Sequence, residues 1–318
     1  MSSAVTVAGK RQSAFQFRDW LVYFVLALLI LLFSVLSNKF FQVENFLGIG
    51  RQTAIVSLMA FGMTFVITSG GIDLSVGSML ALSGMASALA LRSGFGIVGA
   101  SIVGILTGLL QGTISGLLIA KLKIPPFLAT LGIMSVARGV SLTLTNTKTV
   151  VILDKSFTYV WGAGTVLGIP ISIIWTLLFF LAAVFLYHYT PFGNFVKAVG
   201  GNLTAARYSG VNVDRILVLV YMICGLLAGV AGLLMNSRLG GARPEIGAGM
   251  ELDVIAAVIL GGTSVNGGKG NMLNTLIGSL IMGVIVNGLI ILGVPSNIQQ
   301  IIKGLIILIA VAFSAKSE

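Results

Sequence analysis

The chain has 318 residues, of which 57% are hydrophobic and only 9% are charged. Because a water-soluble domain carries about a quarter charged residues, this composition excludes a soluble globular protein, and it is too apolar for a disordered one. The net charge is +10, but lysines and arginines stand singly or in pairs in short connections. That distribution is typical of a membrane protein and excludes a nucleic-acid-binding surface.

Ten apolar segments follow one another along the chain. In order they cover 20–37, 52–69, 74–92, 96–120, 126–145, 171–189, 214–236, 252–264, 272–292 and 298–314. A helix that crosses a bilayer needs roughly 17–25 apolar residues, so the eighth segment is too short to cross straight. We therefore predict an all-α fold, a polytopic membrane helix bundle of about ten transmembrane segments with broken or re-entrant helices.

Both ends of the chain are predicted to lie on the cytoplasmic side. Residues 1–19 carry Lys10, Arg11 and Arg18, and no signal-peptide cleavage site follows them, so we expect the first helix to be retained. An even number of spans then returns the C-terminus to the same side. Basic residues are modestly more frequent in the connections that this places inside. The predicted organisation is a cytoplasmic segment over 1–19 and a single transmembrane domain over 20–318.

Glycines recur every four residues within two of the predicted helices. One set lies at 104, 108, 112 and 116, and a second at 225 and 229. Small residues at this spacing share one helix face and let two helix backbones approach closely. We predict packing inside the bundle from this pattern, rather than a seam between two copies. The single cysteine, Cys224, lies in an apolar segment and is interpreted as a buried structural thiol.

A first break is predicted where Gly70, Gly71 and Asp73 separate the second and third apolar segments. Two interpretations stay open: Asp73 caps the helix that restarts at Leu74, in water at the lipid boundary, or the broken helix lines a transport pathway. A carboxylate inside a bilayer costs about 2.5–3.5 kcal/mol and is seldom accidental. The candidate pathway residues are Thr68, Gly70, Gly71, Asp73, Ser75 and Asn287, although an interhelical hydrogen bond is the commoner role for the last.

A second break is predicted around the short eighth segment. Glu251 and Asp253 precede it, and a glycine-rich stretch from Gly261 to Gly270 follows it. Lys269 among these glycines resembles a phosphate-binding loop only superficially, because Thr263 stands where the motif needs glycine and Gly270 where it needs serine or threonine. We therefore expect no nucleotide site, and no cofactor, in this chain.

An enzyme is not predicted. His188 is the only histidine, and beside two tyrosines at a helix end it fits an interfacial position. No metal-binding cluster and no nucleophile paired with a base is present in the sequence, so we assign no catalytic and no metal residues. Arg138 and Lys303 fall within apolar segments. We expect both to reach the interface near helix ends, with an intramembrane ion pair as the open alternative.

The longest polar connection, 190–213, is predicted to hold a short helix over 203–209. Asn202 is the expected N-cap, and Gly210 ends the helix. The small side chains of Ala205 and Ala206 suit a helix that sits in a groove of a partner protein. An interfacial helix lying on the lipid headgroups is the alternative that these residues leave open.

Four blocks of this sequence resemble one known family. They are the segment 62–84 around GGIDLSVGS, KIPPFLATLG at 123–132, GGNLTAARYSGVNV at 200–213 and ELDVIAAVILGGTSVNGGKG at 251–270. Together they resemble permease subunits of bacterial ABC importers for monosaccharides, of the ribose, xylose and autoinducer-2 type. The resemblance covers roughly residues 40–315.

This resemblance implies a role and a set of partners. It implies that two permease copies or homologues form a pore in the bacterial cytoplasmic (inner) membrane. It also implies that an ATP-hydrolysing subunit, which binds the ATP, docks on the cytoplasmic face, and that a periplasmic sugar-binding protein delivers the substrate. Residues 200–213 match the family's ATPase-coupling loop, which gives that role to Asn202, Ala205, Ala206 and Gly210.

Two alternatives of function remain open at this point. One is an ABC permease for another small solute, such as a branched-chain amino acid. The other is an ion-coupled secondary transporter, for which Asp73 and Asp253 are the intramembrane acids that could bind an ion. Uptake that requires a separate ATPase would distinguish the second from the first.

Overall fold

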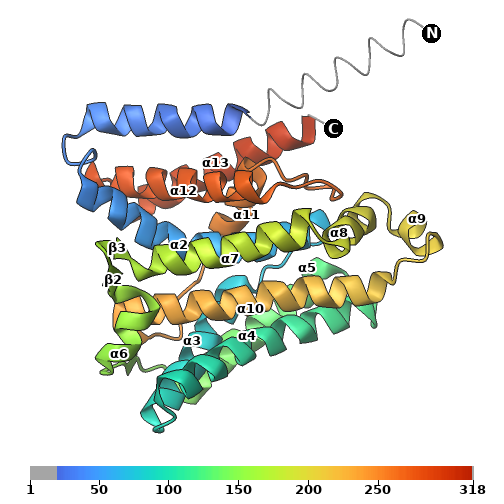
Figure 1. The fold of residues 1–318 in the computed structure, drawn as a ribbon, viewed down its shortest axis with the longest axis horizontal. Coiled ribbons are helices and arrows are strands. Elements are labelled where there is room, and N and C mark those ends of the chain that lie inside the picture. Colours follow the sequence, from blue (N-terminus) through green and yellow to red (C-terminus); the bar gives the residue numbers. More distant parts are fainter. Residues whose placement is uncertain (1–19, 317–318) are drawn as a thin grey trace, which may run out of the picture.

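Long helices that run roughly along one common direction make up most of the molecule (Figure 1). The computed structural model describes residues 20–316. Its helices are Trp20–Leu36, α2 (Val43–Thr68), α3 (Val76–Arg92), α4 (Gly96–Ala120), α5 (Pro126–Thr145), α6 (Lys155–Thr158), the π-helical turn η1 (Tyr159–Ala163), α7 (Ile171–His188), α8 (Pro191–Gly201), α9 (Leu203–Tyr208), α10 (Val213–Leu239), α11 (Met250–Leu260), α12 (Met272–Ile291) and α13 (Ser296–Lys316).

All ten predicted apolar segments are helical, which confirms the all-α membrane bundle. Within residues 20–316, six helices are long and apolar enough to cross a membrane: α2, α4, α5, α7, α10 and α12. Three more, Trp20–Leu36, α3 and Ser296–Ala310 within α13, are apolar but shorter. The eighth predicted segment is the shortest, with 11 residues in α11. The total of ten crossings therefore stays a prediction.

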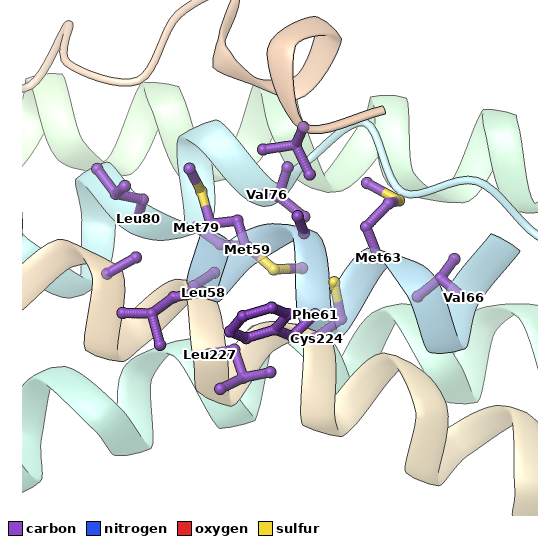
Figure 2. Packing of buried hydrophobic residues seen from close by; sticks show 14 of the residues in the cluster. Leu58, Met59, Phe61, Met63, Val66, Val76, Met79, Leu80, Cys224 and Leu227 are labelled. Atoms are coloured by element: carbon purple, nitrogen blue, oxygen red, sulfur yellow. The ribbon is translucent and has the colours of Figure 1, made fainter. Parts of the chain in front are cut away.

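The centre of the bundle is built around α2 and α10, the helices whose apolar residues are most completely buried among the candidate spans. Figure 2 shows Leu58 and Phe61 of α2 beside Cys224 and Leu227 of α10. Cys224 has no exposed surface, as predicted for a structural thiol.

The regularly spaced glycines lie where α4 crosses α10. A Cβ atom added to Gly108 would come within 2.8 Å of Gly229 Cα, and one added to Gly112 within 3.0 Å of Gly225 Cα. These distances are shorter than ordinary van der Waals contacts, so only glycine lets the two backbones meet. The predicted role of the glycines in packing within the bundle is confirmed.

The two ends of the bundle carry different structures. At one end, the ribbon end, β1 (Val150–Val151) pairs antiparallel with β4 (Gly241–Ala242), and β2 (Thr165–Val166) pairs with β3 (Ile169–Pro170). At the other end, the α9 end, α8 and α9 connect α7 to α10 (Figure 1).

The two basic residues in apolar segments do not reach a helix end. Lys303 Nζ in α13 lies 2.7 Å from Asp253 Oδ2 in α11, so the ion-pair alternative holds for Lys303. Arg138 in α5 donates hydrogen bonds to the carbonyl oxygens of Pro244 and Ile246. The expectation that both residues lie near helix ends is wrong, because Lys303 lies seven residues after the start of α13 and Arg138 seven residues before the end of α5.

Candidate functional site

The first predicted break is present between α2 and α3. α2 ends at Thr68, Gly70 has φ of +86°, and α3 begins at Val76. Asp73 Oδ1 accepts hydrogen bonds from the main-chain N–H of Ser75, at 2.8 Å, and from the Ser75 hydroxyl. The helix therefore restarts two residues later than Leu74, with Ser75 rather than Asp73 at the N-cap position. Asp73 fixes the turn that precedes the helix.

Asp73 is buried without any exposed surface. Its Oδ2 atom has no hydrogen-bond partner among residues 20–316, and neither has the Tyr221 hydroxyl of α10. Tyr221 and Cys224, both on α10, lie close enough to Asp73 to interact with it electrostatically. The interpretation that water solvates Asp73 at the lipid boundary is wrong for this conformation. The carboxylate is instead buried next to the break, close to the side chains of Tyr221 and Cys224.

The second predicted break connects α11 to α12. Gly262, Gly267 and Gly268 all adopt left-handed φ values, of +82°, +85° and +76°. The N–H of Ser264 donates to the carbonyl of Lys269 at 3.0 Å, which closes the segment into a compact loop. Residues 261–271, the glycine loop, therefore turn the chain sharply, as left-handed glycines allow.

The two breaks meet at the α9 end. The N–H of Gly268 donates to the carbonyl oxygen of Thr68 at 2.8 Å. Gly200, near the end of α8, fits against both: an added Cβ would overlap Thr68 O and lie 2.7 Å from Gly268 N. A Cβ on Gly267 would lie 2.8 Å from Gly200 O. Three chain segments thus contact one another through their main chains, and α8 links both breaks.

A tyrosine supports this junction from α7. The Tyr187 hydroxyl lies 3.1 Å from Thr68 Oγ1, and Lys197 Nζ of α8 lies 4.5 Å from the centre of the Tyr187 ring. A cation over an aromatic face is attracted by the ring electrons. The end of α7 therefore holds both α2 and α8 in place.

The predicted short helix is present as α9. Asn202 Oδ1 accepts from the N–H of Ala205 at 2.9 Å, and Gly210, with φ of +84°, follows the helix. The N–H of Val211 donates back to the Ala206 carbonyl at 3.1 Å, a usual helix termination. Ala206 is buried and Ala205 is exposed, so α9 contacts the bundle on one side only.

Three basic residues surround one aspartate beside α9. Asp214 at the start of α10 lies 3.5 Å from Lys121, 2.8 Å from Lys123 and 3.4 Å from Arg207. Lys121 and Lys123 belong to the connection between α4 and α5, whereas Arg207 belongs to α9. The charges therefore tie α9 to that connection, although exposed pairs contribute only about 0–1 kcal/mol each.

Asn287 lies apart from the other candidate residues. Its Nδ2 donates to Asn45 Oδ1 at 2.9 Å, which joins α12 to the first turn of α2. Thr68 is 23 residues further along α2, or about 34 Å at 1.5 Å per residue. The structure thus gives Asn287 the interhelical hydrogen bond, while Thr68, Gly70, Gly71, Asp73 and Ser75 lie together.

Sequence reasoning missed the residues that join these parts. Gly200 lies in the predicted polar connection and Gly267 and Gly268 in the predicted glycine-rich stretch, and neither Tyr187 nor Tyr221 has a predicted role at the breaks. The glycine pairs at 200–201 and 267–268 were a usable signal, since adjacent glycines often mark close approach of backbones. Nothing in the sequence indicated which segment each pair would contact.

Known proteins resemble this chain over most of its length. The family model described as "Branched-chain amino acid transport system / permease component" matches residues 45–311. The ribose import permease protein RbsC of Bacillus subtilis is 47% identical over 294 residues, covering 92% of this chain and 91% of the relative. RbsC of Escherichia coli K12 is 42% identical, covering 98% and 99%. The D-allose transport system permease protein AlsC of Escherichia coli K12 is 39% identical, covering 91% and 89%.

No solved structure matches the chain. The relatives are transport permeases, and each match covers most of this chain and most of the relative. Because the family model and these relatives both extend over most of the sequence, the chain belongs to the family of membrane transport permeases that this model describes.

Proposed function

We propose that this chain is the membrane-spanning permease subunit of a bacterial ABC importer that moves a monosaccharide by alternating access. ATP is bound and hydrolysed by a separate subunit. The relatives named for ribose and D-allose support a monosaccharide as the transported solute. The observation that carries the mechanism is the contact of α8 with both broken helices, through Gly200.

The coupling role falls to α8 and α9. The ATPase subunit docks on the exposed side of α9, which carries Asn202, Ala205 and Gly210, while Ala206 seats the helix on the bundle. When the ATPase subunits close, α9 and α8 move together, because only Asn202 separates them. Displacement of Gly200 then shifts the ends of α2 and the glycine loop, which opens or closes the route.

The break at 69–75 is the proposed gate on the α9 side. A pocket of about 360 Å³ lies beside it, lined in part by Gly70, Gly71 and Tyr221. Asp73 lies near Tyr221 and Cys224 and contributes a carboxylate that accepts a sugar hydroxyl once the gate opens. Thr68 and Ser75 add neutral hydroxyl groups, which suit an uncharged polyol. Asn287 is a weaker candidate because it is bonded elsewhere.

The proposed topology has ten crossings in the inner membrane, with both termini and α9 in the cytoplasm. The ribbon end then faces the periplasm, where a sugar-binding protein docks, and a second permease copy completes the pore. Single cysteines replacing Arg92, Val151 or Gly240 test this orientation. A membrane-impermeant thiol reagent added outside intact cells should label all three. Labelling only after the cells are broken would reverse the topology.

The function is tested by reconstitution in liposomes with the ATPase and binding proteins. We expect ATP-dependent accumulation of radiolabelled D-ribose or D-allose, and none when the permease is reconstituted alone. The family model is described by branched-chain amino acid transport, so a permease for such amino acids is the alternative function. Accumulation of leucine in place of sugar would favour that alternative, whereas accumulation by the permease alone, without nucleotide, would exclude an ABC mechanism.

A further inference from the structure

Residues 243–249 form a loop that enters the bundle from the ribbon end. The loop follows β4 and leads into α11. At Gly247 its main chain touches Gly77 in the first turn of α3: a Cβ on Gly247 would lie 3.2 Å from Gly77 Cα. Gly77 is 15 residues from Arg92, the last residue of α3, or about 22 Å along the helix. The loop therefore reaches the middle depth of the bundle.

Arg138 of α5 holds this loop. Its Nη1 donates to the carbonyl oxygens of Pro244, at 2.6 Å, and Ile246, at 2.8 Å. These are the hydrogen bonds that the guanidinium makes with residues 20–316, so Nη2 and Nε keep their donors available. Arg138 lies seven residues before Thr145, the last residue of α5, which is about 10 Å inside that end.

Two carboxylates accompany Arg138. Glu245 of the loop and Glu251 of α11 both act on it electrostatically, although neither forms an ion pair with it within 4.0 Å in the described part of the chain. Glu251 Oε1 accepts from the N–H of Gly249 at 3.2 Å and so fixes the end of the loop. Glu245 makes no hydrogen bond there and is exposed. Arg138, Glu245 and Glu251 are called the Arg138 cluster below.

The position of this cluster is incompatible with a lipid-facing surface. A charged side chain costs about 2.5–3.5 kcal/mol at the centre of a bilayer and less towards its edges, and the cluster has three charged side chains that are wholly or partly exposed. The exposed face of α7 shows the contrast, because Leu177, Leu181 and Phe185 cover it. In the membrane the charges of the Arg138 cluster therefore favour contact with water over contact with lipid.

We infer that the Arg138 cluster is a binding site for the monosaccharide on its way through the membrane. This inference rests on the proposed function. The Glu245 carboxylate can accept hydrogen bonds from two neighbouring sugar hydroxyls, and Arg138 Nη2 and Nε can donate to a further hydroxyl or the ring oxygen. The cluster has two carboxylates and one guanidinium, and the exposed Arg243 begins the same loop, so charge alone does not select between ligands.

Water access to the cluster can be measured without transport. Cys224 is fully buried, so the wild-type chain is a suitable background for added cysteines. We would compare Glu245→Cys with Leu181→Cys, a 63% exposed position on α7, in lipid nanodiscs treated with a charged, membrane-impermeant methanethiosulfonate. We expect rapid modification of the first variant, at least tenfold slower modification of the second, and protection of the first by saturating D-ribose. Equal rates, or no protection by the sugar, would overturn the inference.

Sugar recognition is tested in the complete reconstituted importer with Glu245→Gln. Because one charged hydrogen bond is replaced by a neutral one, we expect about a tenfold lower uptake rate at limiting D-ribose, with unchanged thermal stability. Glu44→Gln, an exposed carboxylate in the first turn of α2, is the matched control and should behave as the wild type. If the wild type accumulates D-ribose and both variants match it, this inference is wrong. If the wild type accumulates no sugar, the proposed function itself fails.

Discussion

Gly200→Ala is the most informative single change at the contact between α8 and the two breaks. The added methyl group would overlap the Thr68 carbonyl oxygen and lie 2.7 Å from Gly268 N. These two atoms are the acceptor and donor of a 2.8 Å hydrogen bond, so the methyl group would separate them. Both neighbours are main-chain atoms, which cannot move aside by changing a rotamer. The three segments must therefore part, by about 0.7 Å at Gly268 N to reach an ordinary contact distance of about 3.4 Å and by more at the Thr68 carbonyl oxygen.

The expected cost follows from two contributions. Loss of a buried hydrogen bond costs about 0.5–1.5 kcal/mol, and insertion of a methyl group into a packed interior costs about 1–3 kcal/mol. We expect a loss of stability of about 1.5–4.5 kcal/mol in total. Because α8 would no longer seat between the breaks, ATP-driven uptake should fall more than tenfold while the ATPase subunit still binds.

Gly201→Ala is the matched control, since it makes the same chemical change at the next residue. A Cβ there would meet no atom closer than 4.0 Å, so the methyl group has room. Both variants would be compared by thermal unfolding in detergent and by uptake in proteoliposomes. If Gly200→Ala unfolds and transports like Gly201→Ala, main-chain contact at Gly200 does not couple α8 to the breaks.

Three other changes address separate parts of the molecule. Gly210→Leu places a side chain on a residue with φ of +84°, where the surrounding space is open, so we expect a distorted end of α9. The protein should still insert stably, but the sugar should stimulate the importer's ATPase activity less. Unchanged stimulation would argue against coupling through α9. Asp73→Asn keeps the Oδ1 acceptor of the Ser75 turn, so we expect normal thermal stability with reduced uptake, and normal uptake would remove Asp73 from the route. Lys303→Met leaves the Asp253 charge unpaired and should lower the free energy of unfolding by about 1–3 kcal/mol, less than the loss for a fully buried pair. Adding Asp253→Asn should restore most of this stability. A double variant no more stable than Lys303→Met alone would contradict the ion-pair interpretation.

Much of the fold could be predicted because membrane helices leave a strong local signal. Most helix ends fall within two residues of the predicted apolar segments, although α2 begins nine residues earlier, at Val43. Its first turns are less apolar, with Glu44, Asn45 and Arg51, so hydropathy placed the start too late. The N-cap at Asn202 and the glycine after α9 were also local, since capping depends on residues only a few positions apart.

The candidate site was harder to predict because its contacts are between distant segments. Gly200 contacts Thr68 and Gly268, which lie more than 60 residues away on either side in the sequence. Glycine has no side chain whose chemistry would indicate which segment it contacts. Arg138 was expected at a helix end because arginine in an apolar segment usually extends to water. It stays inside because the 243–249 loop brings two carbonyl oxygens to it, which depends on a tertiary path that hydropathy does not encode.

The junction of Thr68, Gly200 and Gly268 has a mechanical consequence. Side chains between two helices can absorb a small push by rotating about their single bonds, and part of the motion is then lost before it reaches the second helix. Here peptide group presses on peptide group, with no rotatable bond between them. A displacement of under an ångström at α8 would therefore move the end of α2 and the glycine loop by nearly the same amount and at the same time.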